Sequence, residues 1–165
     1  MTEISFSPSP AQSADLRRAF GRFGTGVTVI TTQAAIGPLG FTANSFSSVS
    51  LDPALVLWSM GKASQRHDAF ATASHYAVHV LRADQLPLAG HFARQGQGFD
   101  EIAHEMSGDG VPLLHGTLAR FECRAYDCHS AGDHSILIGE VLRATVSEGT
   151  GLAFDQGRYG QFQEH

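Results

Sequence analysis

The sequence has 165 residues, of which 42% are hydrophobic and 16% are charged, enough apolar material for one packed core and too much for a disordered chain. Its formal net charge is -5, so its surface is expected to repel polyphosphate backbones and anionic membranes. We therefore predict no nucleic acid and no membrane among its partners.

The N-terminal residues and the two cysteines favour a cytoplasmic location. Met1–Ile4 carries an acid where a secretory signal has basic residues, and no later run reaches the 18 apolar residues of a membrane span. Cys123 and Cys128 have odd spacing within one expected strand, which directs them to opposite faces and predicts no disulfide. We expect residues 1–12 to form a flexible arm, or a strap across a neighbouring subunit, and residues 13–165 to form a single domain.

The first half of that domain is predicted to contain a helix and several strands. Ser13 is expected to cap a helix whose apolar stripe ends at Phe23, before Gly24. Residues 27–32 are mostly β-branched and predict a strand, followed by a hairpin turn around Gly37. Residues 55–60 form a short apolar run that is typical of a buried strand.

The second half adds two short helices and long antiparallel strands. Ser64 is predicted to cap a helix that continues to Ala73, and a second helix is expected between Asp84 and Gly96. After the strand expected over 76–82, residues 113–146 alternate as two long strands broken by a turn at 131–133. Roughly six strands with three short helices predict a mainly β fold, a closed or nearly closed barrel.

Common nucleotide-binding motifs are missing from the sequence. Gly24 and Gly26 are followed by Val29 where the GxGxxG fingerprint of dinucleotide-binding folds requires glycine. Gly61 and Lys62 lack the upstream glycine and the following serine or threonine of a P-loop. Rossmann-type dinucleotide binding is therefore excluded, and the sequence contains no ATPase signature.

The most informative segment is 40–50, which holds six hydroxyl or amide side chains. Such groups suit a cofactor that has a polar ring edge and a phosphate, because each donates or accepts hydrogen bonds without adding repulsive charge. Lys62 and Ser64 could complete a phosphate site with a cation and a helix N-terminus. The alternative is a serine-rich loop that binds nothing.

Three blocks of sequence carry a resemblance to a known family. They are residues 20–32 (FGRFGTGVTVITT), residues 42–53 (TANSFSSVSLDP), and Gly132-Asp133-His134 followed by Gly139-Glu140-Val141. Together they resemble the short-chain flavin reductases, the reductase partners of two-component flavin monooxygenases. The resemblance implies an FMN-binding split β-barrel and a homodimer with the flavin at or near the subunit interface. It also implies hydride transfer from NADH or NADPH to noncovalent FMN or FAD, with the reduced flavin supplied to an oxygenase.

The resemblance also implies site residues at matching positions. Along the flavin ring it places Thr42, Ala43, Asn44 and Ser45, and at the ribityl chain and phosphate Ser47 and Ser48. On the phosphate side it adds Ser59, Met60, Lys62 and Ser64, and at the helix end near the flavin tail Phe92, Ala93 and Arg94.

The nicotinamide side of the implied site is matched less completely. Asp133 and His134 match the motif associated with nicotinamide binding, and His134 is the predicted catalytic residue beside the stacked rings. Arg158 and Tyr159 match the C-terminal contacts. Asp155 departs from the family pattern and could repel a dinucleotide phosphate, so the choice between NADH and NADPH stays open.

Other candidate sites have weaker support. The densest group of possible metal ligands, around His129 and Cys128, matches no common zinc spacing, and we predict no metal. Trp58 is expected in the core, and His79 is expected to be an ordinary surface or partly buried residue. The alternative function is a noncatalytic flavin-binding or redox-sensing module on the same barrel. An OB-like barrel that binds single strands is disfavoured by the acidic charge.

Overall fold

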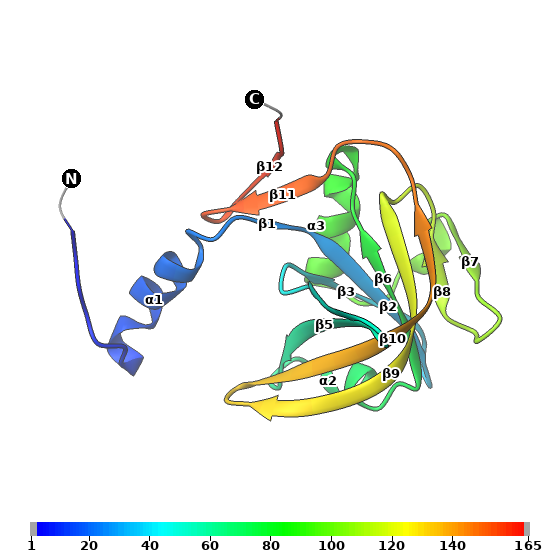
Figure 1. Cartoon of the computed structure of the whole chain (residues 1–165), viewed down its shortest axis with the longest axis horizontal. Helices are drawn as coiled ribbons and strands as arrows, with labels where there is room; N and C mark the ends of the chain where they lie inside the picture. Colours follow the sequence, from blue (N-terminus) through cyan, green and yellow to red (C-terminus); the bar gives the residue numbers. More distant parts are fainter. Residues whose placement is uncertain (1–2, 164–165) are drawn as a thin grey trace.

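The computed structural model describes residues 3–163 and is built around one seven-stranded antiparallel sheet (Figure 1). The strand order is β3-β2-β6-β9-β10-β5-β4. The bounds of these strands are β2 Thr28–Ala34, β3 Gly37–Ala43, β4 Ser47–Leu51, β5 Ala54–Gly61, β6 His75–Val80, β9 Ala119–Ala131 and β10 His134–Val146.

Two smaller sheets and six helical segments complete the described part of the chain. One sheet has the order β1-β11-β12, with bounds Thr25–Gly26, Leu152–Asp155 and Arg158–Gln161. The other pairs β7, His104–Met106, with β8, Pro112–Leu114. The helices are α1 Ser13–Phe20, α2 His67–Ala71 and α3 Leu86–Arg94, with 3-10 turns η1 Pro10–Gln12, η2 Ala83–Gln85 and η3 Phe99–Glu101. None of the helices in residues 3–163 has the length and apolar character needed to cross a membrane.

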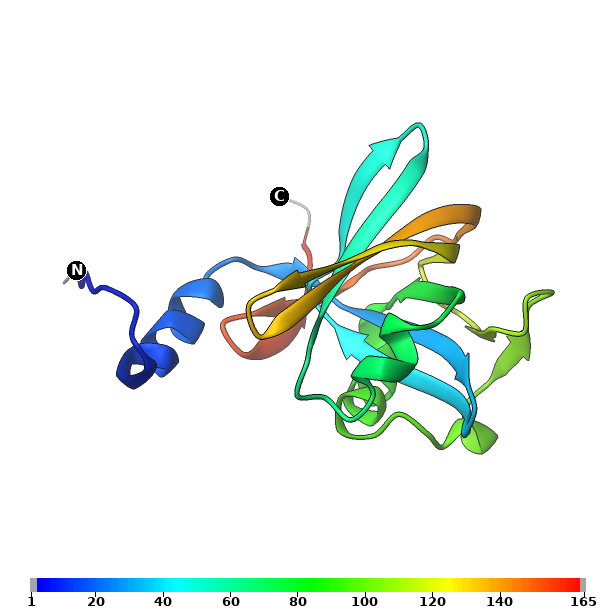
Figure 2. The ribbon, with the colours of Figure 1, turned by 90° about the horizontal axis from the view of Figure 1, so that it is seen from below.

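The large sheet is open along one side. Its hydrogen-bonded order begins at β3 and ends at β4, and these two edge strands are joined in sequence by residues 44–46 alone. Edge strands carry main-chain N–H and C=O groups with no strand partner. We call the gap between β3 and β4 the seam. Figure 2 shows the β4–β5 hairpin, in cyan, projecting from the rest of the protein.

The predicted long hairpin is confirmed as β9–β10. Its two-residue turn begins at Gly132, whose φ of 61° lies in the left-handed region that favours glycine. A bulge shifts the register between Ala125 and Asp127, so that Cys123 pairs with Val141 and Cys128 with Leu137. Val141 and Leu137 share a face of β10. The prediction that the two cysteines face opposite ways is therefore wrong, because the extra residue in the bulge reverses the alternation.

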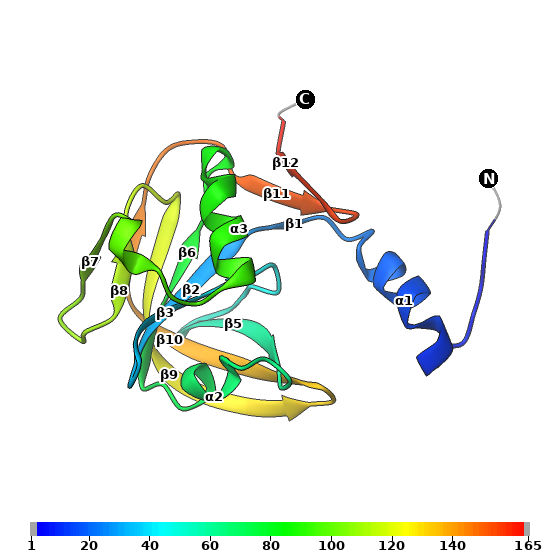
Figure 3. The ribbon, with the colours of Figure 1, turned by 180° about the vertical axis from the view of Figure 1, so that it is seen from behind.

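The core consists of two main apolar clusters on either side of the sheet. One surrounds Trp58, which is fully buried and packs edge-on against Phe70 and Tyr76, so its predicted core position is confirmed. The other contains Phe92 of α3, the helix that packs on β2 and β3 (Figure 3). The ring of Phe92 lies directly against Gly40, where a side chain would collide with it.

Several predicted elements differ from the observed ones. The described residues contain twelve strands, not six, because β4 adds an edge to the large sheet and the short strands β1, β7, β8, β11 and β12 form two small sheets. Helix α2 begins at His67, three residues after Ser64, which lies in the preceding turn and does not cap the helix. Helix α1 has its N-cap at Gln12, and its apolar stripe is uncovered: Phe20 is 69% exposed and Phe23 81% exposed. In Figure 1 this helix projects away from the sheet.

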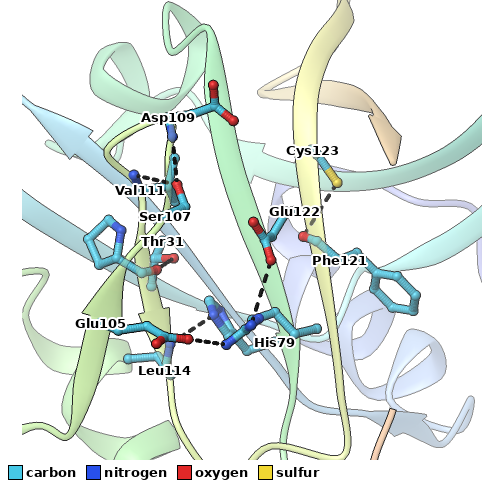
Figure 4. Close-up of polar contacts among 12 residues, drawn as sticks. Thr31, His79, Glu105, Ser107, Asp109, Val111, Leu114, Phe121, Glu122 and Cys123 are labelled. Atoms are coloured by element: carbon cyan, nitrogen blue, oxygen red, sulfur yellow. Dashed lines mark hydrogen bonds and ion pairs between the residues drawn. The ribbon is translucent and has the colours of Figure 1, made fainter. Parts of the chain in front are cut away.

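His79 is a buried polar residue that connects three strands. Figure 4 shows it near Leu114. It lies on β6 with 0% exposure, so the prediction of a surface or partly buried histidine is wrong. Its Nδ1 donates to the carbonyl of Val29, 3.0 Å away, and its Nε2 accepts from the amide of Leu114 at 3.0 Å. Both ring nitrogens are thus satisfied by a neutral imidazole, which explains how the burial is tolerated.

Candidate functional site

The hydroxyl-rich segment predicted to bind a cofactor forms the seam of the sheet. The side chain of Thr42 points into the protein, where its hydroxyl donates to the carbonyl of Ala89 on α3 at 2.7 Å. The hydroxyl of Ser45 donates to the carbonyl of Ser59 at 3.1 Å and accepts from the amide of the same residue at 2.9 Å. These bonds fix the segment to α3 on one side and to β5 on the other.

The remaining side chains of the segment are available for a ligand. Asn44, Ser47 and Ser48 are exposed, whereas Ala43 is buried. The exposed groups are a neutral amide and two hydroxyls beside two strands that each lack a strand partner on their outer side. That donor set can bind a neutral polar ring through several hydrogen bonds without a repulsive charge.

The end of β5 brings other predicted residues beside this segment. Ser59 is held there by Ser45, but the side chain of Met60 is 1% exposed and belongs to the core. Only the main chain of Met60 can therefore contact a ligand. The ammonium of Lys62 does not point to an open phosphate site, because it donates to the hydroxyl of Ser130 at 2.6 Å and to the carbonyl of Gly132 at 2.7 Å.

The Gly132-Asp133-His134 turn lies directly beside the end of β5. His134 pairs with Gly61 in the sheet register, and the side chain of His134 is half exposed above that glycine. Its Nδ1 and the Oδ1 of Asp133 are 2.8 Å apart. This hydrogen bond, followed by the charge of His134, holds the pKa of the Asp133 carboxyl below its usual value. The bond orients the ring so that Nε2 is free for a ligand.

A cavity of about 980 Å³ lies between α2, the tip of the β2–β3 hairpin and the end of α3. Ser64 and Arg94 line it, as do Gln65 and Arg66, which were not predicted. Its volume lies at the upper end of the range for small-molecule sites, roughly 300–1,000 Å³. Two guanidinium groups make its wall suitable for an anionic group such as a phosphate.

Arg66 shapes this cavity through contacts with distant segments. Its Nη1 donates to the carbonyls of Gly40 at 2.9 Å and Phe92 at 2.7 Å, and its guanidinium lies 5.0 Å from the centre of the Phe41 ring. Partial burial lowers the pKa of Arg66 from its ordinary value. No local pattern marks this arginine, because its partners come from β3 and α3.

The predicted residues at the end of α3 and on β12 are only partly available to a ligand bound near His134. The side chain of Phe92 is fully buried, so that end of α3 presents only the exposed Ala93 and Arg94. Arg158 and Tyr159 are on β12, where the Tyr159 ring packs against Phe154 with centroids 5.1 Å apart. Figure 1 shows β12 well separated from the tip of the β9–β10 hairpin within this chain.

The observed groups fit the flavin and nicotinamide predicted from the sequence. Neutral hydroxyls and strand edges that lack a strand partner line the seam, a cavity bordered by arginines lies on one side of β3, and an oriented imidazole lies at the end of β5. The described residues contain no group of three or more His, Cys, Asp or Glu side chains arranged to hold a metal ion.

Comparisons with known proteins agree with this fit. Residues 20–163 match the family model for the flavin reductase like domain. The FMN reductase (NADH) SmoA of Agrobacterium fabrum is 53% identical over 160 residues, which cover 97% of this chain and 92% of that protein. The reductase component of a flavin-dependent trigonelline monooxygenase from Acinetobacter baylyi is 47% identical over 147 residues, covering 88% of this chain and 47% of that relative.

A solved structure shows the same fold. The NADH:FAD oxidoreductase SgcE6 of Streptomyces globisporus superposes with a TM-score of 0.90 at 38% identity, covering 100% of this chain and 96% of that one. The same oxidoreductase has also been solved in complex with NAD and FAD fragments. The predicted mainly β split barrel is confirmed, with its open side at the seam. The chain therefore belongs to the flavin reductase like domain family.

Proposed function

We propose that this protein is an NADH-dependent flavin reductase that reduces noncovalently bound FMN or FAD and supplies the reduced flavin to a separate flavin-dependent oxygenase. The observation that carries the proposal is the seam. Its exposed amide and hydroxyls are fixed by Ser45 beside the end of β5, and His134 lies next to that end in the same sheet. The site thus has adjacent places for two cofactors. The relatives described as NADH-dependent reductases support the choice of donor.

Each part of the site has a distinct task in this proposal. Asn44, Ser47 and Ser48 bind the ring and ribityl chain of the flavin, while Ser64 and Arg94 hold its phosphate side at the cavity. His134, oriented by Asp133, contacts the nicotinamide. The flavin accepts a hydride from the reduced nicotinamide, a reaction that needs no protein base or metal. The protein therefore contributes position and hydrogen bonds.

We also propose that the protein acts as a homodimer. Leu51 on the projecting β4–β5 hairpin is 97% exposed, and Phe20 at the end of α1 and Phe23 just after it are 69% and 81% exposed. Apolar surface of this kind is typical of protein–protein interfaces. A second copy would cover these residues and could bring its own C-terminal strand, with Arg158 and Tyr159, to the seam.

The experiment that tests the function is a steady-state assay that crosses FMN and FAD with NADH and NADPH. The purified protein is expected to oxidise NADH rapidly when flavin is present and only at the background rate without flavin. Flavin binding without nicotinamide oxidation would contradict the reductase proposal and favour a noncatalytic flavin-binding module. Sedimentation of the same sample tests the dimer.

A further inference from the structure

Lys62 makes an unusual set of contacts for a lysine at the end of a strand. Its ammonium donates to the hydroxyl of Ser130 and the carbonyl of Gly132, at 2.6 and 2.7 Å. Its main-chain amide donates to the carbonyl of Asp133 at 2.9 Å. One residue of the β5 end thus contacts one arm of the β9–β10 hairpin and both central residues of its turn.

The end of the β9–β10 hairpin has an exposed outer strand and an exposed turn. Residues 124–134 are all exposed. Beyond Arg124 the β9 strand is the outer strand of this end, because β6 pairs with β9 only as far as Arg124 while β10 continues to pair with β5. An exposed outer strand and its turn open more easily than the buried part of a sheet. Beyond strand pairing, hydrogen bonds that join this end to other segments include one from the amide of Ala125 to the carbonyl of Ser74 at 2.8 Å. Nearest to His134 are the bonds of Lys62 and a hydrogen bond between the Nε2 of His67 and the hydroxyl of Ser135, 2.9 Å apart. They lie on either side of His134.

We propose that Lys62 is a positioning residue for the nicotinamide, and that it does not bind the flavin phosphate. Lys62 holds the Gly132-Asp133-His134 turn in the position where His134 contacts the nicotinamide. Lys62 itself does not contact the nicotinamide. This inference rests on the proposed reductase function. A lysine bound to a phosphate would instead have its ammonium free and directed to the cavity, whereas here two protein acceptors already use two of its three hydrogens.

Two variants separate these two roles. Lys62→Met removes the ammonium, and Ser130→Ala removes one of its acceptors without changing any group that could reach a phosphate. A matched control is Ser147→Ala, because Ser147 is exposed and its hydroxyl makes no hydrogen bond within residues 3–163. For each protein the KM for NADH is measured with FMN, and the affinities for FMN and for riboflavin, which lacks the phosphate, are measured by fluorescence quenching.

The positioning role predicts a defect confined to the nicotinamide. Lys62→Met is expected to raise the KM for NADH about tenfold, which corresponds to the loss of a charge-assisted hydrogen bond. Ser130→Ala is expected to raise it about threefold, because Lys62 keeps its bond to the carbonyl of Gly132. Both variants should bind FMN and riboflavin as the unaltered protein does, and Ser147→Ala should match it in every measurement. Lys62→Arg, which keeps a cation able to donate, should recover part of the loss.

Other outcomes overturn the inference. If Lys62→Met weakens the binding of FMN but not of riboflavin, and Ser130→Ala behaves as Ser147→Ala does, then Lys62 binds the phosphate. An unchanged KM for NADH in Ser130→Ala also contradicts the positioning role, and this variant decides the matter even if Lys62→Met folds poorly. Failure of the unaltered protein to oxidise NADH would instead show that the proposed function itself is wrong.

Discussion

The buried imidazole of His79 makes the stability of this protein depend on pH in a calculable way. Its ring accepts a hydrogen bond from Leu114 and donates one to Val29, an arrangement that requires the neutral form. Burial lowers the pKa of His79 to about 3, and the charge of Arg120 contributes in the same direction. His79 therefore stays neutral in the folded protein at pH values below about 6.5, where the same imidazole in the unfolded chain is protonated.

The sign and size of the effect follow from these two pKa values. Between pH 6.5 and about 3 the unfolded state binds more protons, so the free energy of unfolding falls as the pH falls through this window. The contribution is fully present above pH 6.5 and is lost by about pH 3. Each pKa unit corresponds to about 1.4 kcal/mol, so the loss reaches about 2 kcal/mol at about pH 5 and about 5 kcal/mol in full.

Urea denaturation of two proteins at about pH 8 and about pH 5 measures this contribution. The control is His79→Gln, whose amide can still donate to Val29 and accept from Leu114 but does not titrate. Between the two pH values the unaltered protein is expected to lose about 2 kcal/mol more than the variant. Equal losses in both proteins would refute the reasoning, because the titration of His79 would then contribute nothing.

Three further substitutions test the packing around the seam. Gly40→Ala places a methyl group against the buried ring of Phe92 and is expected to cost about 1–3 kcal/mol, seen as a lower Tm. Ser45→Ala removes both hydrogen bonds to Ser59 and should lower the free energy of unfolding by roughly 1–2 kcal/mol while weakening flavin binding more than it raises the KM for NADH. Thr42→Val removes a hydroxyl that donates to α3 and should cost about 1 kcal/mol in urea denaturation, whereas Thr42→Ser, which keeps the donor, should cost less. A Gly40→Ala protein with an unchanged Tm, or a Ser45→Ala protein with unchanged flavin affinity, would contradict the described role of that residue.

Much of the sheet could be predicted from local patterns. The long hairpin was expected because two alternating segments flank a turn, and Gly132 takes the positive φ that such a turn needs. The faces of the two cysteines were predicted wrongly because a bulge leaves no mark in the alternation around it. The apolar stripe expected to end at Phe23 is present, but a stripe shows only that a face is apolar, and in residues 3–163 Phe20 and Phe23 at its end stay 69% and 81% exposed.

The site was predictable in its parts but not in the direction of its side chains. Ser64, assigned to the phosphate side, and Arg94, assigned to the flavin tail, both line the cavity. Lys62 points elsewhere because its partners lie 68 and 70 positions further along the chain, in a hairpin that local spacing does not connect to it. Arg66 was missed for the same reason. Whether a polar side chain faces a ligand or another strand depends on the register of the whole sheet.

The short connection across the open side of the sheet has a consequence for how this fold tolerates change. The chain passes from the last residue of β3 to the first residue of β4 in four steps. Since each step spans at most about 3.6 Å, the two edges at that end lie within about 14 Å of each other. The separation of the two sheet edges at that end is therefore limited by the covalent backbone itself. Inserted residues would loosen that limit, so length variation among related proteins should be accommodated outside residues 44–46.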